Sequence, residues 1–139
     1  MLTRFLVLIF VVLAGPALAS KPVGILYDCT ITQKKERLFW IPQKLAIVIK
    51  DNGDAVVFDE VIMRFNDAPM AARIWRDTDR RLVVRWTLKD LVNSANQHTA
   101  AFDYEARLNK SNNRISVYAS PEGYPDRFTG KGQCTPRSG

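Results

Sequence analysis

The segment Phe102–Ala119, FDYEARLNKSNNRISVYA, alternates apolar and polar residues on both sides of a polar turn. Its apolar positions are Phe102, Tyr104, Ala106, Leu108, Ile115, Val117 and Ala119. A period of two is typical of an antiparallel strand that buries one face. If Asn109 pairs with Arg114 across the turn, Leu108 lies opposite Ile115 and the two apolar faces agree. The segment therefore predicts a β-hairpin.

The same alternation extends from this hairpin toward both ends of the chain. Further strands are expected over residues 25–32, 45–49, 55–65, 81–88 and 127–134. The expected inward residues include Ile25, Tyr27, Cys29, Ile31, Leu82, Val84, Trp86 and Leu88. In the last strand, Gly130 and Gly132 are in phase with Cys134 and indicate a bend or a close approach between backbones.

A second hairpin is indicated by Asp51-Asn52-Gly53-Asp54, because Asn-Gly between apolar runs is the strongest short-range hairpin signal. Pairing residue 51 with residue 54 would place Ile49 opposite Val56 and Ile47 opposite Phe58. The register predicted from this pairing puts all four apolar side chains on one face.

Two segments fit a short helix better than a simple strand. Asp67–Trp75 begins with a capping residue and a proline in its first turn, which favours a helical turn followed by a strand. The same residues also fit a strand that is hairpinned to 81–88 through a turn at 77–80. In Thr87–Asn96 the apolar residues have helical spacing, which predicts a short helix.

Seven or eight short strands in local hairpins favour an all-β fold, a small antiparallel meander barrel with one or two short helical segments. A β-sandwich is the alternative, because the number of strands does not separate the two architectures. No repeat or linker divides residues 20–139, so they are expected to form a single domain.

The N-terminus has the pattern of a signal peptide. Arg4 precedes the apolar run Phe5–Ala14, and Ala17-Leu18-Ala19 offers small residues for cleavage before Ser20. A spanning helix needs ~20 apolar residues, and this run is shorter. We therefore expect residues 1–19 to be removed, leaving an exported domain, periplasmic or extracellular, without a membrane span.

The chain has two cysteines, Cys29 and Cys134, and in an exported protein they predict one disulfide. The bridge would join the first and last strands and close a loop of ~100 residues. Two cysteines and the single histidine, His98, are too few to predict a metal site, and no cofactor motif is visible.

The formal net charge of +6 falls to about +5 without Arg4, which leaves a moderately basic domain. Such a charge favours acidic partners, either an acidic protein or an anionic envelope surface. Nucleic acid is not an expected partner, because export separates the protein from it and no recognition motif is present.

The sequence offers no catalytic constellation, so an enzyme is not expected. A serine–histidine system would depend on His98, and no Gly-x-Ser-x-Gly elbow presents a nucleophile. Asp103 and Glu105 share one strand face, as paired glycosidase carboxylates can, but Arg107 and neighbouring strands are expected to balance them on a solvated surface.

Two groups of residues are candidates for binding. An aromatic group on the expected inner faces can line a cup for a small apolar ligand or fill the core of the barrel: Trp75, Trp86, Phe102, Tyr104 and Phe128. An arginine group on one outer face, Arg76, Arg81 and Arg85, can bind a carboxylate-rich partner through bidentate contacts or serve solubility.

In its layout, the chain resembles small bacterial periplasmic barrel proteins. Tyr27-Asp28-Cys29 near the start and Gly130-Lys131-Gly132-Gln133-Cys134 near the end are similar to the Tyr-x-Cys and closing cysteine of the membrane-bound inhibitors of C-type lysozyme. The serine- and glycine-containing inhibitory loop of that family has no counterpart here. The resemblance implies a protein-binding or inhibitory module; a lipocalin-like carrier of a small apolar molecule is the alternative.

Overall fold

The computed structural model describes Gly15, residues 24–35 and residues 39–138. The predicted signal peptide, residues 1–19, lies outside the described residues apart from Gly15. The elements, in chain order, are β1 Gly24–Gln33, β2 Lys44–Lys50, β3 Ala55–Asp59, α1 Glu60–Asn66, β4 Met70–Asp77, β5 Arg81–Leu88, β6 Phe102–Asn109, β7 Arg114–Pro121 and β8 Phe128–Ser138.

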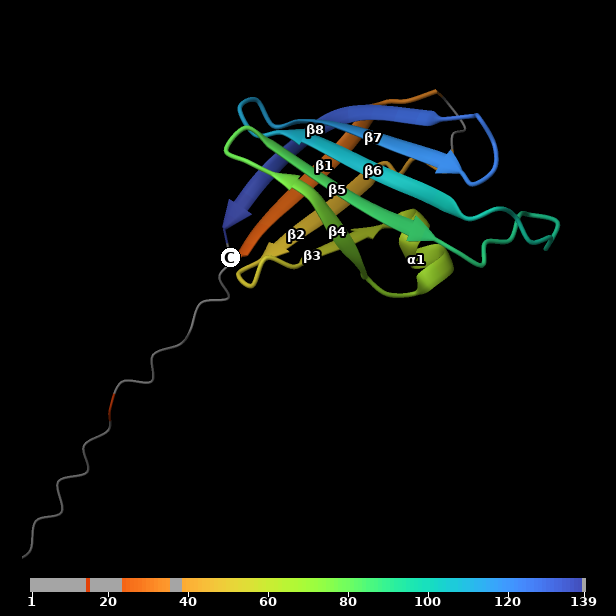
Figure 1. Ribbon diagram of the computed structural model, residues 1–139, viewed down its shortest axis with the longest axis horizontal. Helices are drawn as coiled ribbons and strands as arrows, with labels where there is room; N and C mark the ends of the chain where they lie inside the picture. Colours follow the sequence, from red (N-terminus) through yellow and green to blue (C-terminus); the bar gives the residue numbers. More distant parts are fainter. Residues whose placement is uncertain (1–14, 16–23, 36–38, 139) are drawn as a thin grey trace, which may run out of the picture.

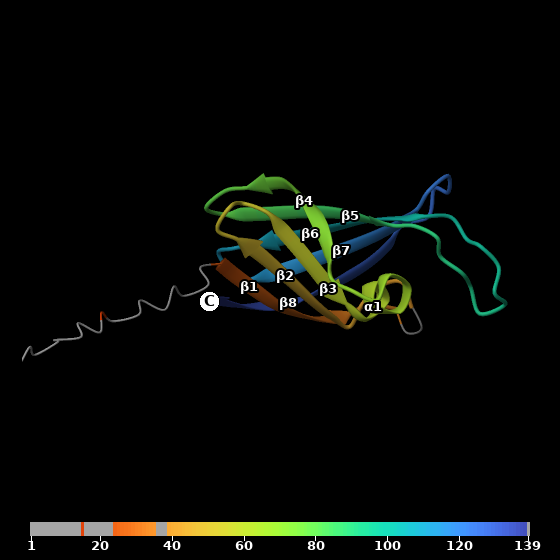
Figure 2. The ribbon, with the colours of Figure 1, turned by 90° about the horizontal axis from the view of Figure 1, so that it is seen from below.

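The strands form a closed barrel in which each pairs antiparallel with the next and β8 returns to pair with β1 (Figure 1). The predicted meander barrel is thus confirmed and the sandwich excluded. Short hairpins and the C-terminus lie at one end, whereas α1 and the longer β5–β6 and β7–β8 loops lie at the other (Figures 1 and 2). In the described part of the chain, no helix is both long enough and apolar enough to cross a membrane.

The disulfide joins the strands that close the barrel. Cys29 of β1 and Cys134 of β8 are direct cross-strand partners and are bonded, as predicted. Close packing of β1 and of Ile41, which follows β1, against β8 also explains the two glycines of β8. A Cβ on Gly132 would overlap the Thr30 backbone, and one on Gly130 would lie 2.5 Å from an Ile41 methyl carbon.

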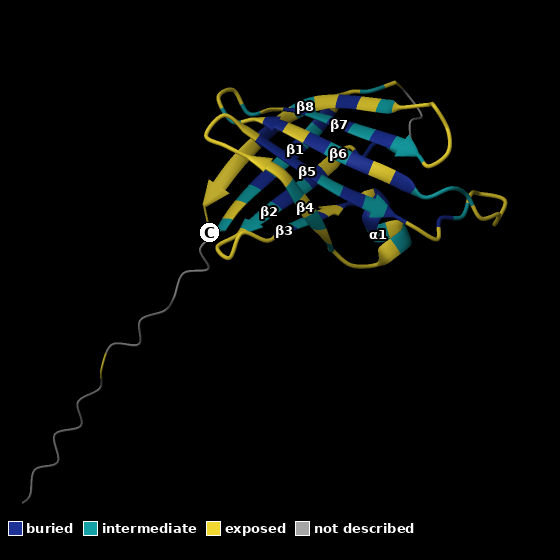
Figure 3. Cartoon of the chain, in the orientation of Figure 1, coloured by how far each residue is buried: buried dark blue, intermediate teal, exposed yellow. Residues whose placement is uncertain are grey.

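The barrel interior is filled by the inward side chains of the strands, which alternate with less buried positions along most strands (Figure 3). The β6–β7 hairpin has the predicted register, with Asn109 opposite Arg114 and Leu108 opposite Ile115. The predicted inward residues of β5 are also buried. Period-two alternation therefore predicted the core of this half of the barrel.

The β2–β3 register differs by one residue from the predicted one. Ile49 lies opposite Ala55 and Ile47 opposite Val57, so Phe58 points outward and is 42% exposed. The hairpin closes on Lys50, whose amide and carbonyl bond to Asp54 and Gly53. Because Gly53 takes φ +86°, the loop has three residues instead of two.

The strand predicted over 55–65 ends early, at Asp59, and the chain turns into helix α1. The Asp59 carboxylate accepts a hydrogen bond of 2.7 Å from the Ile62 amide and so caps the helix. Val61 and Ile62 are buried, which shows that α1 packs onto the barrel through its first turn. The apolar residues that suggested a strand belong instead to this helix.

The two helices predicted from the sequence are not present. In Asp67–Trp75 the predicted helical turn is absent, but the strand predicted after it is present, because residues 70–75 belong to β4 and form the alternative hairpin with residues 81–88. Thr87–Asn96 finishes β5 and continues as a loop, in which Val92 pairs with His98. Leu88 and Leu91 are buried through barrel packing, and this burial explains their apolar character without a helix.

Candidate partner-binding surface

The outer face of β4–β8 carries a row of charged and aromatic residues that crosses the strands. Arg73 of β4 pairs with Arg85 of β5, Arg85 with Glu105 of β6, and Glu105 with Tyr118 of β7. Outward positions of neighbouring strands lie about 5 Å apart, so these side chains are in contact range. Antiparallel register therefore assembles one site from four strands.

Glu105 holds two arginines in place. Its carboxylate accepts one hydrogen bond from Arg85 Nε, at 2.6 Å, and another from Arg107 Nε. The Glu105 side chain is only 13% exposed, whereas the Arg85 and Arg107 side chains that bind it are 41% and 48% exposed. Partial burial by itself raises the Glu105 pKa, but the hydrogen bonds and charges of Arg107 and Arg85 outweigh it and hold the pKa below its ordinary value.

An aromatic ring lies on each side of this central group. The guanidinium carbons of Arg85 and Arg73 lie 4.0 and 5.4 Å from the centre of the Trp75 ring. Those of Arg127 and Arg107 lie 3.7 and 5.0 Å from the centre of the Tyr118 ring. Such cation–π contacts order the arginines while leaving their N–H groups able to donate.

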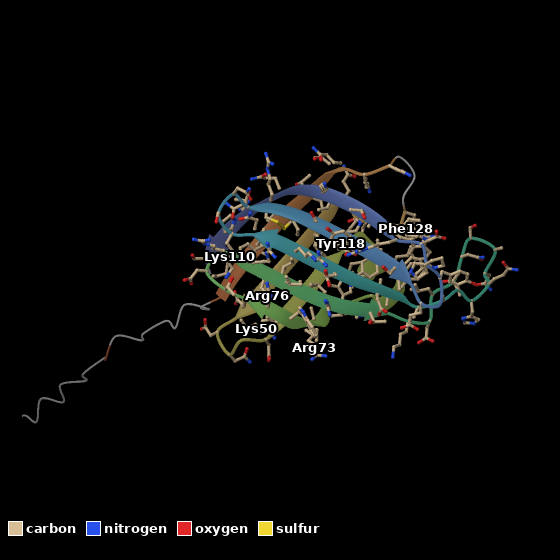
Figure 4. The ribbon with its side chains drawn as sticks, turned by 45° about the horizontal axis from the view of Figure 1, so that its top comes forward. Lys50, Arg73, Arg76, Lys110, Tyr118 and Phe128 are labelled. Atoms are coloured by element: carbon tan, nitrogen blue, oxygen red, sulfur yellow. A yellow bond between two sulfur atoms is a disulfide. The ribbon has the colours of Figure 1, made fainter. Side chains whose placement is uncertain are left out.

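We call this set the arginine ladder. In order across the sheet, its members are Arg73, Trp75, Arg85, Glu105, Arg107, Tyr118 and Arg127. All but Arg107 line a shallow groove of about 500 Å³. Figure 4 shows Arg73 and Tyr118 on this side of the barrel.

The arginines predicted from the sequence lie on this face, but only one belongs to the ladder. Arg85 is central to it. Arg76 and Arg81 are exposed nearer the end with the short hairpins, where Arg76 pairs with Val83 and Arg81 with Asn109 (Figure 4 labels Arg76). The sequence did place Glu105 and Arg107 outward, and the predicted β6–β7 register would have set Tyr118 beside them.

Trp75 does not lie inside the barrel as predicted. A register shift between Ile74 and Arg76 inserts Trp75 as an extra residue opposite β5, and its side chain is 53% exposed on the outer face. Trp75 points outward by ordinary alternation, because the half-buried Ile74 before it packs against the core. Trp75 therefore belongs to the arginine ladder and not to the predicted ligand cup.

The other four aromatic residues of the predicted cup pack against one another inside the barrel. Trp86 stacks on Tyr104 with ring centres 5.2 Å apart, and Phe102 stacks on the half-buried Phe128. Trp40 stacks on Phe102 at 4.2 Å, and its carbonyl accepts a hydrogen bond from the Tyr104 hydroxyl. These contacts fill the α1 end of the interior and favour core packing over a ligand cup.

The carboxylates of β6 are engaged in ordinary surface contacts. Asp103 accepts a hydrogen bond of 2.6 Å from the Thr87 hydroxyl, and Glu105 is bound by its two arginines. Within residues 24–35 and 39–138, no group of three or more histidine, cysteine or acidic side chains could hold a metal ion.

Fold and surface together define a small, closed, eight-stranded antiparallel barrel with an ordered basic outer face. Comparison of the chain with protein-family models, curated proteins and solved structures gives no match.

Proposed function

We propose that this barrel is a non-catalytic binding module that recognises an acidic protein through the arginine ladder. The observation that carries the proposal is the double hydrogen bond of Glu105, which takes the Nε atoms of Arg85 and Arg107. Each guanidinium keeps its terminal nitrogens for a partner. Guanidinium groups fixed in this way suit bidentate binding of carboxylates.

The charge and shape of the groove support this choice. The ladder contains four arginines and one carboxylate, so positive charge dominates although Asp103 also lines the groove. The groove is open and shallow, which suits a protein surface better than a small molecule enclosed on most sides. The packed aromatic interior gives the alternative of a carrier for an apolar ligand no comparable support.

Binding to poly-L-glutamate, measured by calorimetry at low salt, tests the proposal. The variant R85Q/R107Q should bind at least tenfold more weakly, since each charge-assisted hydrogen bond contributes roughly 1.5–3 kcal/mol. Added salt should also weaken binding by the wild type, because exposed charges are screened over about 10 Å at 0.1 M.

The matched control is R81Q/R114Q, which removes the same charge from exposed positions on β5 and β7 outside the ladder. If the control loses as much affinity as R85Q/R107Q, net charge and not the ladder determines binding. If neither variant weakens binding, the proposed site is wrong.

We also propose that the domain is exported, as the N-terminal pattern and the disulfide suggest. The test is the intact mass of the protein recovered from the exported fraction of an expressing cell. The expected mass is that of a chain beginning at Ser20, less two hydrogens for the bridge. A chain that retains residues 1–19 would contradict cleavage.

A further inference from the structure

We infer that the ladder binds an extended acidic segment of a partner protein, laid across β4–β8 with carboxylates at every second residue. This inference rests on the proposed function and specifies its ligand. It derives from the order and spacing of the four ladder arginines, which come from β4, β5, β6 and the approach to β8.

Shared contacts link neighbouring arginines in the ladder. The guanidinium carbons of Arg73 and Arg85 lie 5.4 and 4.0 Å from the centre of the Trp75 ring, and those of Arg107 and Arg127 lie 5.0 and 3.7 Å from the centre of the Tyr118 ring. The Glu105 carboxylate binds both Arg85 and Arg107. Because the four arginines come from β4, β5, β6 and the residue before β8, the cationic groups follow a line across the sheet and are not gathered around one point.

The central spacing follows from strand geometry. Arg85 pairs with Glu105, so Arg107 is its diagonal neighbour two residues further along β6. Diagonal neighbours lie about 7–8 Å apart. In an extended peptide, side chains two residues apart point the same way and lie about 6.7 Å apart. One face of an extended segment thus presents carboxylates at nearly the spacing of these arginines.

The length of the ladder agrees with this arrangement. From β4 to β8 there are four gaps between adjacent strands, and strands lie about 4.8 Å apart, so the ladder spans about 19 Å. Seven extended residues cover about 20 Å and carry four side chains on one face. Four carboxylates can therefore meet four arginines.

The phosphates of a single-stranded nucleic acid could also bind along a line of cations. The contacts that the two aromatic rings already make favour a polypeptide instead. Proteins that bind single strands stack the bases on aromatic side chains. Here the Trp75 and Tyr118 rings carry guanidinium groups at 4.0 and 3.7 Å. Bases would have to displace those arginines, whereas carboxylates use them as they stand.

Two capped heptapeptides of equal composition and charge provide the test: the alternating Glu-Ser-Glu-Ser-Glu-Ser-Glu and the clustered Glu-Glu-Glu-Glu-Ser-Ser-Ser. Calorimetry with the wild-type protein should show at least tenfold tighter binding of the alternating peptide, because only two clustered carboxylates can face the ladder at once. Equal affinities would overturn the inference and leave recognition by charge intact.

The variant E105Q examines the spacing directly. It removes a negative charge, so both peptides should bind more tightly, but Arg85 and Arg107 lose the carboxylate that fixes their separation. The preference for the alternating peptide should then fall by at least threefold. An unchanged preference in E105Q would contradict the spacing argument.

Two further outcomes would also overturn the inference. Tighter binding of a seven-nucleotide oligothymidylate than of the alternating peptide, at equal salt, would point to single-stranded nucleic acid. Failure of both peptides to bind would reject the extended segment as the ligand. If poly-L-glutamate still binds, the proposed function stands without this inference. If poly-L-glutamate does not bind either, the proposed function is rejected as well.

Discussion

Replacement of the buried Asp59 by asparagine should stabilise the protein at neutral pH. Asp59 is 3% exposed, and its Oδ2 atom has no hydrogen-bond partner among the described residues. Burial raises its pKa from 3.8 to about 6, with a smaller contribution from Glu60 and against the lowering effect of the Ile62 amide. Asparagine keeps an oxygen for that amide and carries no charge.

The pH dependence follows from the direction of this shift. Between about pH 4 and pH 6 the folded protein holds the proton on Asp59 more tightly than the unfolded chain does. The stabilisation that protonated Asp59 contributes is therefore complete below about pH 4 and is lost as the pH rises through 6. A shift of roughly 2 pKa units corresponds to about 3 kcal/mol.

Urea unfolding of the wild type and of D59N, followed by tryptophan fluorescence, measures this effect. The two proteins should have similar free energies of unfolding at pH 4, and D59N should be the more stable by about 3 kcal/mol at pH 8. D79N, in the exposed β4–β5 turn, is the matched control and should shift stability by no more than ~0.5 kcal/mol. A stability difference between wild type and D59N that is the same at both pH values would refute the reasoning.

Three further changes examine the closure and packing of the barrel. Cys29→Ala should cost roughly 2–5 kcal/mol in thermal or urea unfolding, the usual loss for a native bridge in a small secreted domain, and reductant should abolish its difference from wild type. Gly132→Ala should cost roughly 1–3 kcal/mol, because its Cβ would meet the Thr30 backbone; an unaffected melting temperature would show that β8 can shift freely. Tyr104→Phe should lose about 1 kcal/mol with the hydrogen bond to the Trp40 carbonyl, and an unchanged urea midpoint would contradict that role.

The sequence predicted structure best where a turn alone sets the strand register. At Lys110–Asn113, the polar turn fixed which residues of β6 and β7 face each other, and the prediction was confirmed. At Asn52-Gly53, the same kind of signal was misread by one residue, because the left-handed Gly53 lengthened the loop. Backbone conformation at one glycine thus decided which side of β3 entered the core.

Tertiary contacts account for the remaining errors in the fold. α1 is too short to show a clear helical period, and it depends on the cap from Asp59 and on burial of its first turn. Asp67 and Pro69 are residue types that often begin a helix, but the residues after them pair with β3 and β5 and so form the strand β4. The helix propensity of these few residues was outweighed by strand pairing in the closed barrel.

The candidate site could be predicted only in part, because it depends on pairings between strands. Alternation within β6 correctly turned Glu105 and Arg107 outward. Trp75 lies outward because Met70, Ala72 and Ile74 hold the inward positions of β4, a phase that the sequence left open when it favoured a helical turn in this segment. Arg127 lies in a loop before β8, and nothing in the sequence places it over the Tyr118 ring.

Pairing of β8 with β1 also determines which step of folding comes last. Every other strand pair joins neighbours in sequence, whereas this pair brings together residues 105 positions apart. Closing so long a loop slows folding, and any sheet that the other seven strands form before this pairing has two free edges. A partly folded chain is therefore most prone to aggregation before its last strand pairs, and the bridge between Cys29 and Cys134 then removes that state.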